Sequence, residues 1–261
     1  LTADDQHDSP AELPLHGRAG TVTIVHYDLW HRAMANVGAR DRFMVKFLFA
    51  RMSEPVAPSW HHDESPWPQT GKAEDVLCEQ LWNWMCGTSD AGPAPMPAES
   101  GLAEALLAEA EIERYAAAYR LGLAGDAGLP TLIDALRLEG DRRVQANTER
   151  RHTNPAQFDA AYGLTVAGPA AVPALADLLT DEKWWLRASA ADALGDMGLA
   201  ASEGAPALTD ALTDTSAWVR RNAAEALGNI GSAGGTARPG LAACLTDSDD
   251  AVRHNAALAL L

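Results

Sequence analysis

A histidine and an arginine near the start of the chain, His31 and Arg42, are residues whose types and spacing could do chemistry. An imidazole nitrogen is a common ligand of iron and other transition metals. The guanidinium group of an arginine stays charged and can bind a carboxylate through two parallel hydrogen bonds. A metal ligand and a carboxylate anchor held close together would suit a metal enzyme that binds an organic acid.

Two apolar segments contain this pair and predict adjacent strands. Residues 20–31 and 42–51 are rich in β-branched and aromatic residues, and a turn-prone connection separates them. If that connection centres on residues 36 and 37, His31 and Arg42 lie at equal distances from it. Directly opposed residues of an antiparallel pair have Cβ atoms about 5 Å apart. The sequence therefore predicts that the two side chains lie close together.

The order of residues in this segment is similar to that of a known enzyme family. Residues 15–55 contain, in order, a glycine, an apolar strand, an Asp-Leu-Trp-His run, an asparagine and an arginine (Gly20, 21–25, 28–31, Asn36 and Arg42). This order resembles the end of the double-stranded β-helix of the phytanoyl-CoA dioxygenase family, whose members are Fe(II)- and 2-oxoglutarate-dependent oxygenases. The resemblance implies that His31 is an iron ligand and that Arg42 binds 2-oxoglutarate. It also implies Fe(II) as the cofactor and a small-molecule substrate in the barrel.

The family's other two iron ligands form a His-x-Asp motif upstream of this histidine. Residues 26–28 and 61–63 have the right letters. The first motif lies in the same predicted strand as His31, and the second lies beyond Arg42 in a proline-rich loop, where a solvated turn is the alternative interpretation. We therefore expect the motif to lie before residue 1. The first residue is not methionine and an apolar helical run ends the sequence without a cap, so we also expect a fragment truncated at both ends.

The second half of the chain is a tandem repeat. Residues 186–198, 219–231 and 252–261 align with a period of 33 residues, and each block follows a segment that begins with a proline. Proline is tolerated in the first turn of a helix, and glycine often ends one. Each repeat is predicted to be two short helices, the first opened by proline and the second closed by glycine (Pro173, Pro206, Pro239; Gly195, Gly228).

An aspartate stands six residues before an arginine in all three repeats (Asp181/Arg187, Asp214/Arg220 and Asp247/Arg253). The Thr-Pro-Leu-His signature of ankyrin repeats, which have a similar period, is absent. Residues 112–261 resemble HEAT repeats, particularly the alanine-rich type also found in phycobilin lyases. The resemblance implies that these aspartates and arginines form a structural ladder between repeats. The alternative interpretation is that the arginines form a row that binds an anion. Trp184, Trp185 and Trp218 are predicted to pack between repeats.

These observations predict a mainly α fold in which a HEAT-type α-solenoid follows the last strands of a double-stranded β-helix. We expect residues 1–58 to be the C-terminal part of a dioxygenase β-barrel, 59–100 a linker with one amphipathic helix, and 101–261 HEAT repeats, the last truncated. The amphipathic helix is predicted within residues 73–86. Its predicted apolar face consists of Val76, Leu77, Leu81, Trp82, Trp84 and Met85.

Composition narrows the class of partner. A formal net charge of −16 argues against nucleic acid or an anionic membrane, and the sequence has neither a signal peptide nor a long apolar run. Three cysteines without a CxxC pair indicate a reduced, cytoplasmic compartment. Two functions remain open. One is a 2-oxoglutarate oxygenase with a protein-binding HEAT tail, and the other is a non-catalytic interaction protein that carries a partial barrel.

Overall fold

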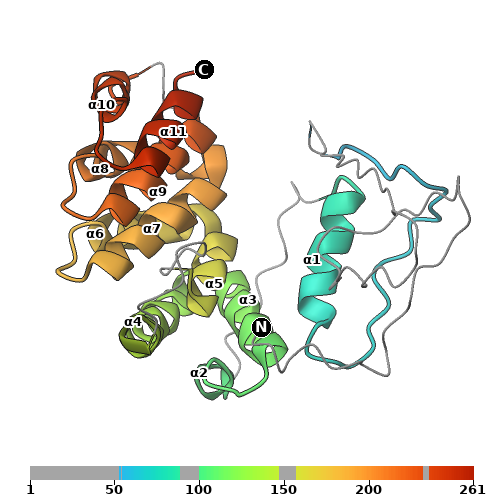
Figure 1. Cartoon of the computed structure of the whole chain (residues 1–261). Helices are drawn as coiled ribbons and strands as arrows, with labels where there is room; N and C mark the ends of the chain where they lie inside the picture. The colour runs from blue at the N-terminus through green and yellow to red at the C-terminus, as the bar shows by residue number, and fades with distance from the viewer. Residues whose placement is uncertain (1–52, 54, 89–99, 147–156, 232–234) are drawn as a thin grey trace, which may run out of the picture. The chain divides into compact units, whose positions relative to one another are not determined.

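The computed structural model describes residues 53, 55–88, 100–146, 157–231 and 235–261, and these residues form helices and loops without a strand. The mainly helical prediction is confirmed for them (Figure 1). The predicted barrel strands within residues 20–51 lie outside the described residues, and the domain boundary at residue 58 stays a prediction. None of the described helices combines the length and hydrophobicity that crossing a bilayer requires.

Three helix pairs follow one another from residue 172 onward and stack in two rows, with the longer helices of successive pairs side by side (Figure 1). The pairs are α6 (Val172–Leu178) with α7 (Trp184–Asp196), α8 (Ala205–Ala211) with α9 (Ala217–Ile230), and α10 (Arg238–Cys244) with α11 (Asp250–Ala259). A proline occupies the first turn of each short helix, where its missing N–H leaves no hydrogen bond unmade. The predicted two-helix repeat is confirmed.

Five described helices precede these pairs: α1 (Asp75–Met85), α2 (Leu102–Ala105), α3 (Glu111–Leu123), α4 (Leu129–Ala146) and α5 (Asp159–Ala167). Helix α5 packs between α3 and α7 and so continues the row of longer helices. Two short 3₁₀ segments and a longer one connect neighbouring helices (Gly125–Ala127, Gly168–Ala171 and Gly198–Gly204).

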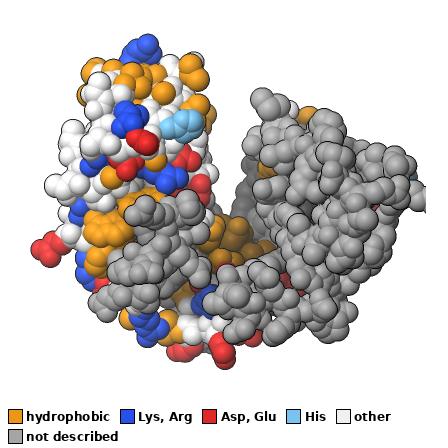
Figure 2. All heavy atoms as spheres, viewed as in Figure 1, with side chains coloured by type: hydrophobic (Ala, Val, Ile, Leu, Met, Phe, Trp, Pro, Cys, Tyr) orange, Lys and Arg blue, Asp and Glu red, His pale blue; other side chains and the backbone are white. Residues whose placement is uncertain are grey.

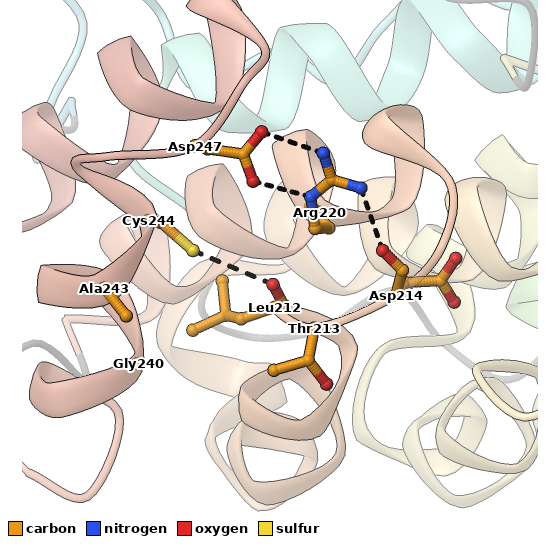
Figure 3. A pocket seen from close by; sticks show the side chains of 8 residues that line it. All are labelled: Leu212, Thr213, Asp214, Arg220, Gly240, Ala243, Cys244 and Asp247. Atoms are coloured by element: carbon orange, nitrogen blue, oxygen red, sulfur yellow. Dashed lines mark hydrogen bonds and ion pairs between the residues drawn. The ribbon is translucent and has the colours of Figure 1, made fainter.

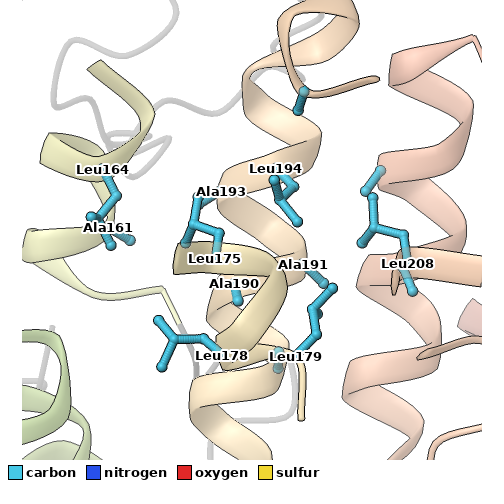
Figure 4. Packing of buried hydrophobic residues seen from close by; sticks show 14 of the residues in the cluster. Ala161, Leu164, Leu175, Leu178, Leu179, Ala190, Ala191, Ala193, Leu194 and Leu208 are labelled. Carbon is cyan, nitrogen blue, oxygen red and sulfur yellow. The ribbon is translucent and has the colours of Figure 1, made fainter. Parts of the chain in front are cut away.

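One continuous hydrophobic core runs through α2 to α11. Leucines from both rows are its largest members, and Leu164, Leu175, Leu194 and Leu208 are at most 1% exposed (Figure 4). Each fully buried leucine stabilises the fold by about 1.5–3 kcal/mol through removal of apolar surface from water. Small alanines between the leucines let the longer helices approach one another closely.

The prediction that Gly195 and Gly228 close the second helices is wrong, because both residues lie inside α7 and α9. Helix α9 instead ends at Gly231, whose φ of 76° is the left-handed conformation that favours glycine. A Cβ atom added to Gly195 would lie 3.0 Å from Ala226 Cα, and one on Gly228 would lie 3.1 Å from Ala259 Cα. These glycines recur because neighbouring helices cross at them without room for a side chain.

Helix α1 (Asp75–Met85) confirms the amphipathic helix, but its apolar face differs from the prediction. Val76 is buried and packs with Ala116 and Leu123 of α3. Leu81 and Met85 remain 56% and 36% exposed. Leu81 lies five residues after Val76, about 140° further around the helix, and therefore points away from the buried face.

The start of α1 is fixed by the carboxylate of Asp75. This buried group accepts hydrogen bonds from the backbone N–H groups of Thr70 and Gly71 at 2.7 Å, from the Thr70 hydroxyl at 2.9 Å and from the Trp67 indole at 3.4 Å. Burial raises the pKa of Asp75, but the bonds from Thr70 and Gly71 outweigh burial, and the pKa falls below its usual range. The loop before α1 is thus tied to the helix by one charged group.

Candidate functional site

The two residues that carry the oxygenase interpretation, His31 and Arg42, lie outside the described residues, so their roles stay predictions. Within the described ranges, no group of three or more His, Cys, Asp or Glu side chains could hold a metal ion. In the segment 61–63, His61 and Asp63 are exposed, whereas the His62 ring packs against Trp82 with centroids 5.4 Å apart. In the structure this segment is irregular chain that lies against α1 through the His62 and Trp82 rings.

Two arginines of the longer helices bind the aspartate of the next repeat and thereby form the predicted ladder. Arg187 donates from Nε and Nη2 to Asp214 at 2.6 and 2.8 Å, and Arg220 donates likewise to Asp247 at 2.7 and 2.8 Å. The aspartate six residues earlier contributes only its backbone carbonyl, which accepts from Nη1 of Arg187 at 2.8 Å and of Arg220 at 2.9 Å. The ladder therefore links neighbouring repeats and leaves these arginines no free edge for an anion.

The electrostatics of the ladder agree with this structural role. The hydrogen bond from Arg220 lowers the pKa of Asp247 to about 2. Burial raises the pKa of Asp214, but the bonds from Arg187 and from the Ser216 N–H, with the charge of Arg187, together outweigh burial, and the net shift is downward. The side chains of Arg187 and Arg220 are only 13% and 14% exposed.

A cavity of about 380 Å³ lies beside this ladder, between α8 and α10 (Figure 3). Leu212, Thr213 and Gly240 line it together with Arg220, whose guanidinium faces Asp247. The thiol of Cys244 is directed toward the Leu212 carbonyl oxygen at 3.8 Å, and burial raises its pKa. A protonated thiol and a fully engaged arginine are not a catalytic set.

A second group of polar side chains lies along the row of longer helices. The rings of Tyr115 on α3 and Tyr162 on α5 meet edge to face, with centroids 5.3 Å apart. Burial raises the pKa of Tyr162, and Asp192 and Asp196 of α7 raise it further. Carboxylates shift a neighbour's pKa in this way only when they are close to it.

The same group continues to α9. Asp196 keeps an exposed side chain, but the protein atoms around it displace part of its water and raise its pKa, and the negative charge of Glu225 adds to the rise. Glu225 is exposed as well, and it accepts a hydrogen bond from Asn255 of α11 at 2.9 Å. We call Tyr115, Tyr162, Asp192, Asp196 and Glu225 the acidic row. It combines aromatic faces with carboxylates that repel one another, an arrangement that favours a cation.

The HEAT-repeat family matches residues 157–214 and 172–261. This part of the chain is therefore similar to HEAT repeats. Among solved structures, the complex of CpcE and CpcF of phycocyanin lyase from Nostoc sp. PCC7120 is 20% identical, with 61% of this chain and 96% of that chain covered and a TM-score of 0.42. A designed armadillo repeat protein in complex with the peptide (KR)4 is 18% identical over 73% of this chain and 86% of its own, with a TM-score of 0.37. No curated protein matches the chain.

One rung of the HEAT ladder was missed from the sequence. Arg114 of α3 donates from Nε to Asp159 at 2.5 Å and from Nη1 to the carbonyl oxygen of Ala108 at 3.0 Å, the same geometry that Arg187 has with its own turn. The two partners are 45 residues apart instead of 27, so the period of 33 does not reveal them. The position six residues before Arg114 is Ala108 and not an aspartate, so the sequence pattern of the other rungs does not mark this one.

The tryptophans of the HEAT repeats lie against the core, as predicted. Trp184, Trp185 and Trp218 are partly buried there. Trp185 fills the space left by Gly140 of α4, where an added Cβ would lie 2.7 Å from the indole. The guanidinium of Arg221 stacks over the Trp218 ring at 4.8 Å. Packing accounts for these contacts.

Proposed function

We propose that this chain is a non-catalytic interaction protein whose HEAT-repeat solenoid binds a protein partner along the acidic row. The observation that carries the proposal is that the side chains of the row come from four helices, α3, α5, α7 and α9, each of which packs against the next. A rigid stack with a continuous row of this kind suits an extended ligand better than a small molecule.

The chemistry of the row favours a partner segment that carries lysines and arginines. Partial loss of water and the nearby Glu225 both raise the pKa of Asp196, which means that they destabilise its ionised form. A bound cation would stabilise that form. The faces of Tyr115 and Tyr162 can stack with guanidinium and ammonium groups. On the face of the repeats seen in Figure 2, acidic and basic side chains are mixed in small groups, so a broad single-sign patch is not what selects the partner there.

A binding assay with a fluorescent lysine- and arginine-rich peptide tests this proposal. The double variant Asp196→Asn/Glu225→Gln should weaken binding by roughly two- to thirtyfold, since each exposed pair contributes about 0.2–1 kcal/mol and both would bind the same ligand. The control is the double variant Asp177→Asn/Asp210→Asn, which also removes two negative charges, but from exposed side chains on α6 and α8. This control should bind nearly as well as the parent chain.

Equal loss of affinity in the two double variants would mean that the peptide responds only to the net charge of −16, and the proposal would fail. A peptide of the same length rich in glutamate should not bind in any of the proteins.

A second candidate function is the Fe(II)/2-oxoglutarate oxygenase, and the observation in its favour is the sequence around His31 and Arg42. In a protein that carries a His-x-Asp motif before residue 1, Arg42→Ala should raise the half-saturating concentration of 2-oxoglutarate by roughly tenfold or more, because a charge-assisted bond contributes about 1.5–3 kcal/mol. Arg42→Lys should do less harm, and His31→Ala should abolish consumption of the keto acid. Unaltered half-saturation in Arg42→Ala would show that this residue is a surface cation.

A further inference from the structure

The guanidinium of Arg221 on α9 is held in place, yet it donates no hydrogen bond to any residue that the structure describes. It stacks over the Trp218 ring, with Cζ 4.8 Å from the ring centroid. Packing accounts for the indole, but a guanidinium also carries N–H donors that lie in its plane. The neighbouring Arg220 uses Nε and both terminal nitrogens in bonds to Asp247 and to its own turn. Arg221 is thus a positioned cation with unused donors.

The carboxylate best placed to pair with Arg221 is held by another residue. Glu225 lies four residues further along α9, so both side chains lie on the same face of the helix. The amide of Asn255 on α11 donates to a carboxylate oxygen of Glu225 at 2.9 Å and to the backbone carbonyl oxygen of Arg221 at 3.3 Å. Trp218 holds the guanidinium, and Asn255 holds the carboxylate. A cation and an anion therefore stand next to each other on α9 and remain available to a ligand.

The spacing of these two charges fits an extended segment of a partner. Four residues of an α-helix rise by about 6 Å. In an extended chain, side chains two residues apart point to the same side and are separated by about 6.6 Å. A segment that places a lysine or arginine at Glu225 can therefore place an acidic residue at Arg221. The planar guanidinium binds a carboxylate through two parallel hydrogen bonds, and the Trp218 ring covers one face of it.

We propose that Arg221 and Trp218 form a subsite for an acidic residue beside the acidic row, and that the partner segment is extended and carries a glutamate or aspartate two residues from a lysine or arginine. This inference rests on the proposed function, because the basic residue of that pair binds the acidic row at Glu225. The subsite adds a selectivity that net charge does not supply. A chain with a net charge of −16 repels an acidic residue except beside a cation that is not yet neutralised.

Two fluorescent peptides test the subsite. Both repeat Lys-Thr, because β-branched threonines disfavour a helix, and the central lysine is replaced by glutamate in one peptide and by glutamine in the other. Arg221→Ala should weaken binding of the glutamate peptide by roughly three- to tenfold, because a charge-assisted bond at a partly exposed site is lost. Binding of the glutamine peptide should change by less than about twofold. Arg221→Lys should lose part of the affinity for the glutamate peptide, since an ammonium group keeps the charge but not the two-pronged geometry.

Arg238→Ala is the matched control, because it removes one positive charge from an exposed side chain on α10. It should leave the ratio of the two peptide affinities unchanged. An equal effect of Arg221→Ala on both peptides would overturn the proposal. Thermal melts followed by circular dichroism show whether each variant folds, and Arg221→Lys, which keeps an aliphatic stem over Trp218, gives the same comparison if Arg221→Ala does not.

Failure of the acidic row itself has a different signature. The double variant Asp196→Asn/Glu225→Gln would then bind the glutamine peptide as tightly as the parent chain does, and the subsite proposal would fall with the row. We expect that double variant to bind both peptides more weakly than the parent, whereas Arg221→Ala should affect the glutamate peptide alone.

Discussion

Replacing Asp247 with asparagine should destabilise the solenoid by removing one charge from the ladder while leaving the side chain's shape nearly unchanged. Asp247 accepts two hydrogen bonds from Arg220, at 2.7 and 2.8 Å, and one from the backbone N–H of Asp249 at 2.8 Å. The bond from Arg220 is the main reason that the pKa of Asp247 falls from 3.8 to about 2.

The size of the effect follows from that shift. One pKa unit corresponds to about 1.4 kcal/mol, so the shift sets an upper value of about 2.5 kcal/mol. Solvent screens part of this pair at the edge of the stack, and we expect about 1–2 kcal/mol at pH 7. Because the folded-state pKa is the lower one, this stability is present above the unfolded-state value and is lost as the pH falls from about 4 toward 2.

Urea denaturation of the full chain and of Asp247→Asn, followed by circular dichroism at pH 7, 4 and 2.5, measures the difference directly. The two unfolding free energies should differ most at pH 7 and converge in acid. Arg253→Ala is a matched control, since it removes a ladder-type arginine whose carboxylate partner is exposed and should change the unfolding free energy by less than about 0.7 kcal/mol at pH 7. A difference between parent and Asp247→Asn that stays constant from pH 7 to pH 2.5 would refute the electrostatic account.

Two further changes test the packing. Gly195→Leu should lower the free energy of unfolding by about 1–3 kcal/mol, because the new side chain would meet Ala226 of α9. Gly231→Ala adds a methyl group that meets open space, so the positive φ alone should lower the free energy of unfolding by about 1 kcal/mol; thermal melts of both variants give the comparison. Asp75→Ala should release the loop that holds Trp67 and Thr70, so limited proteolysis should cut between residues 66 and 72 faster than in the parent, while the melting of the HEAT repeats stays the same. An unchanged cleavage rate in Asp75→Ala would contradict the anchoring role.

The repeated half of the fold could be predicted because its signals are local and periodic. The prolines at 173, 206 and 239 begin helices as expected, and the recurring aspartates and arginines do form a ladder. The resemblance implied a ladder between repeats, but the spacing of six residues does not say which aspartate each arginine binds, and the partner of Arg187 is 27 residues further along the chain. Sequence spacing alone does not contain that direction.

Other features required the three-dimensional arrangement. Gly195 was interpreted as a helix end because glycine ends many helices, and only the crossing with Ala226 shows that it serves close packing. The acidic row combines residues of four helices, and a tyrosine at one repeat is replaced by a carboxylate at the next, so no single repeat identifies it. Leu81 was assigned to an apolar face that α1 does not bury.

The ladder also fixes how the stack can deform. Arg187 and Arg220 each bind a neighbouring repeat through two short bonds, so that edge of the stack behaves as a stiff seam that resists stretching. At Asp181 the seam is weaker, because Arg137 of α4 donates to this carboxylate at 3.1 Å and Lys183 binds Asp141 of α4 at 2.6 Å, but Arg137 and Lys183 are 47% and 41% exposed. The part of the stack that Arg187 and Arg220 link should therefore stay rigid, and bending should occur mainly between α5 and α7. Bending of the solenoid would then move α5 relative to α7 more than α7 relative to α9. The distance between Tyr162 and the carboxylates of α7 would change more than the distance between those carboxylates and Glu225 of α9.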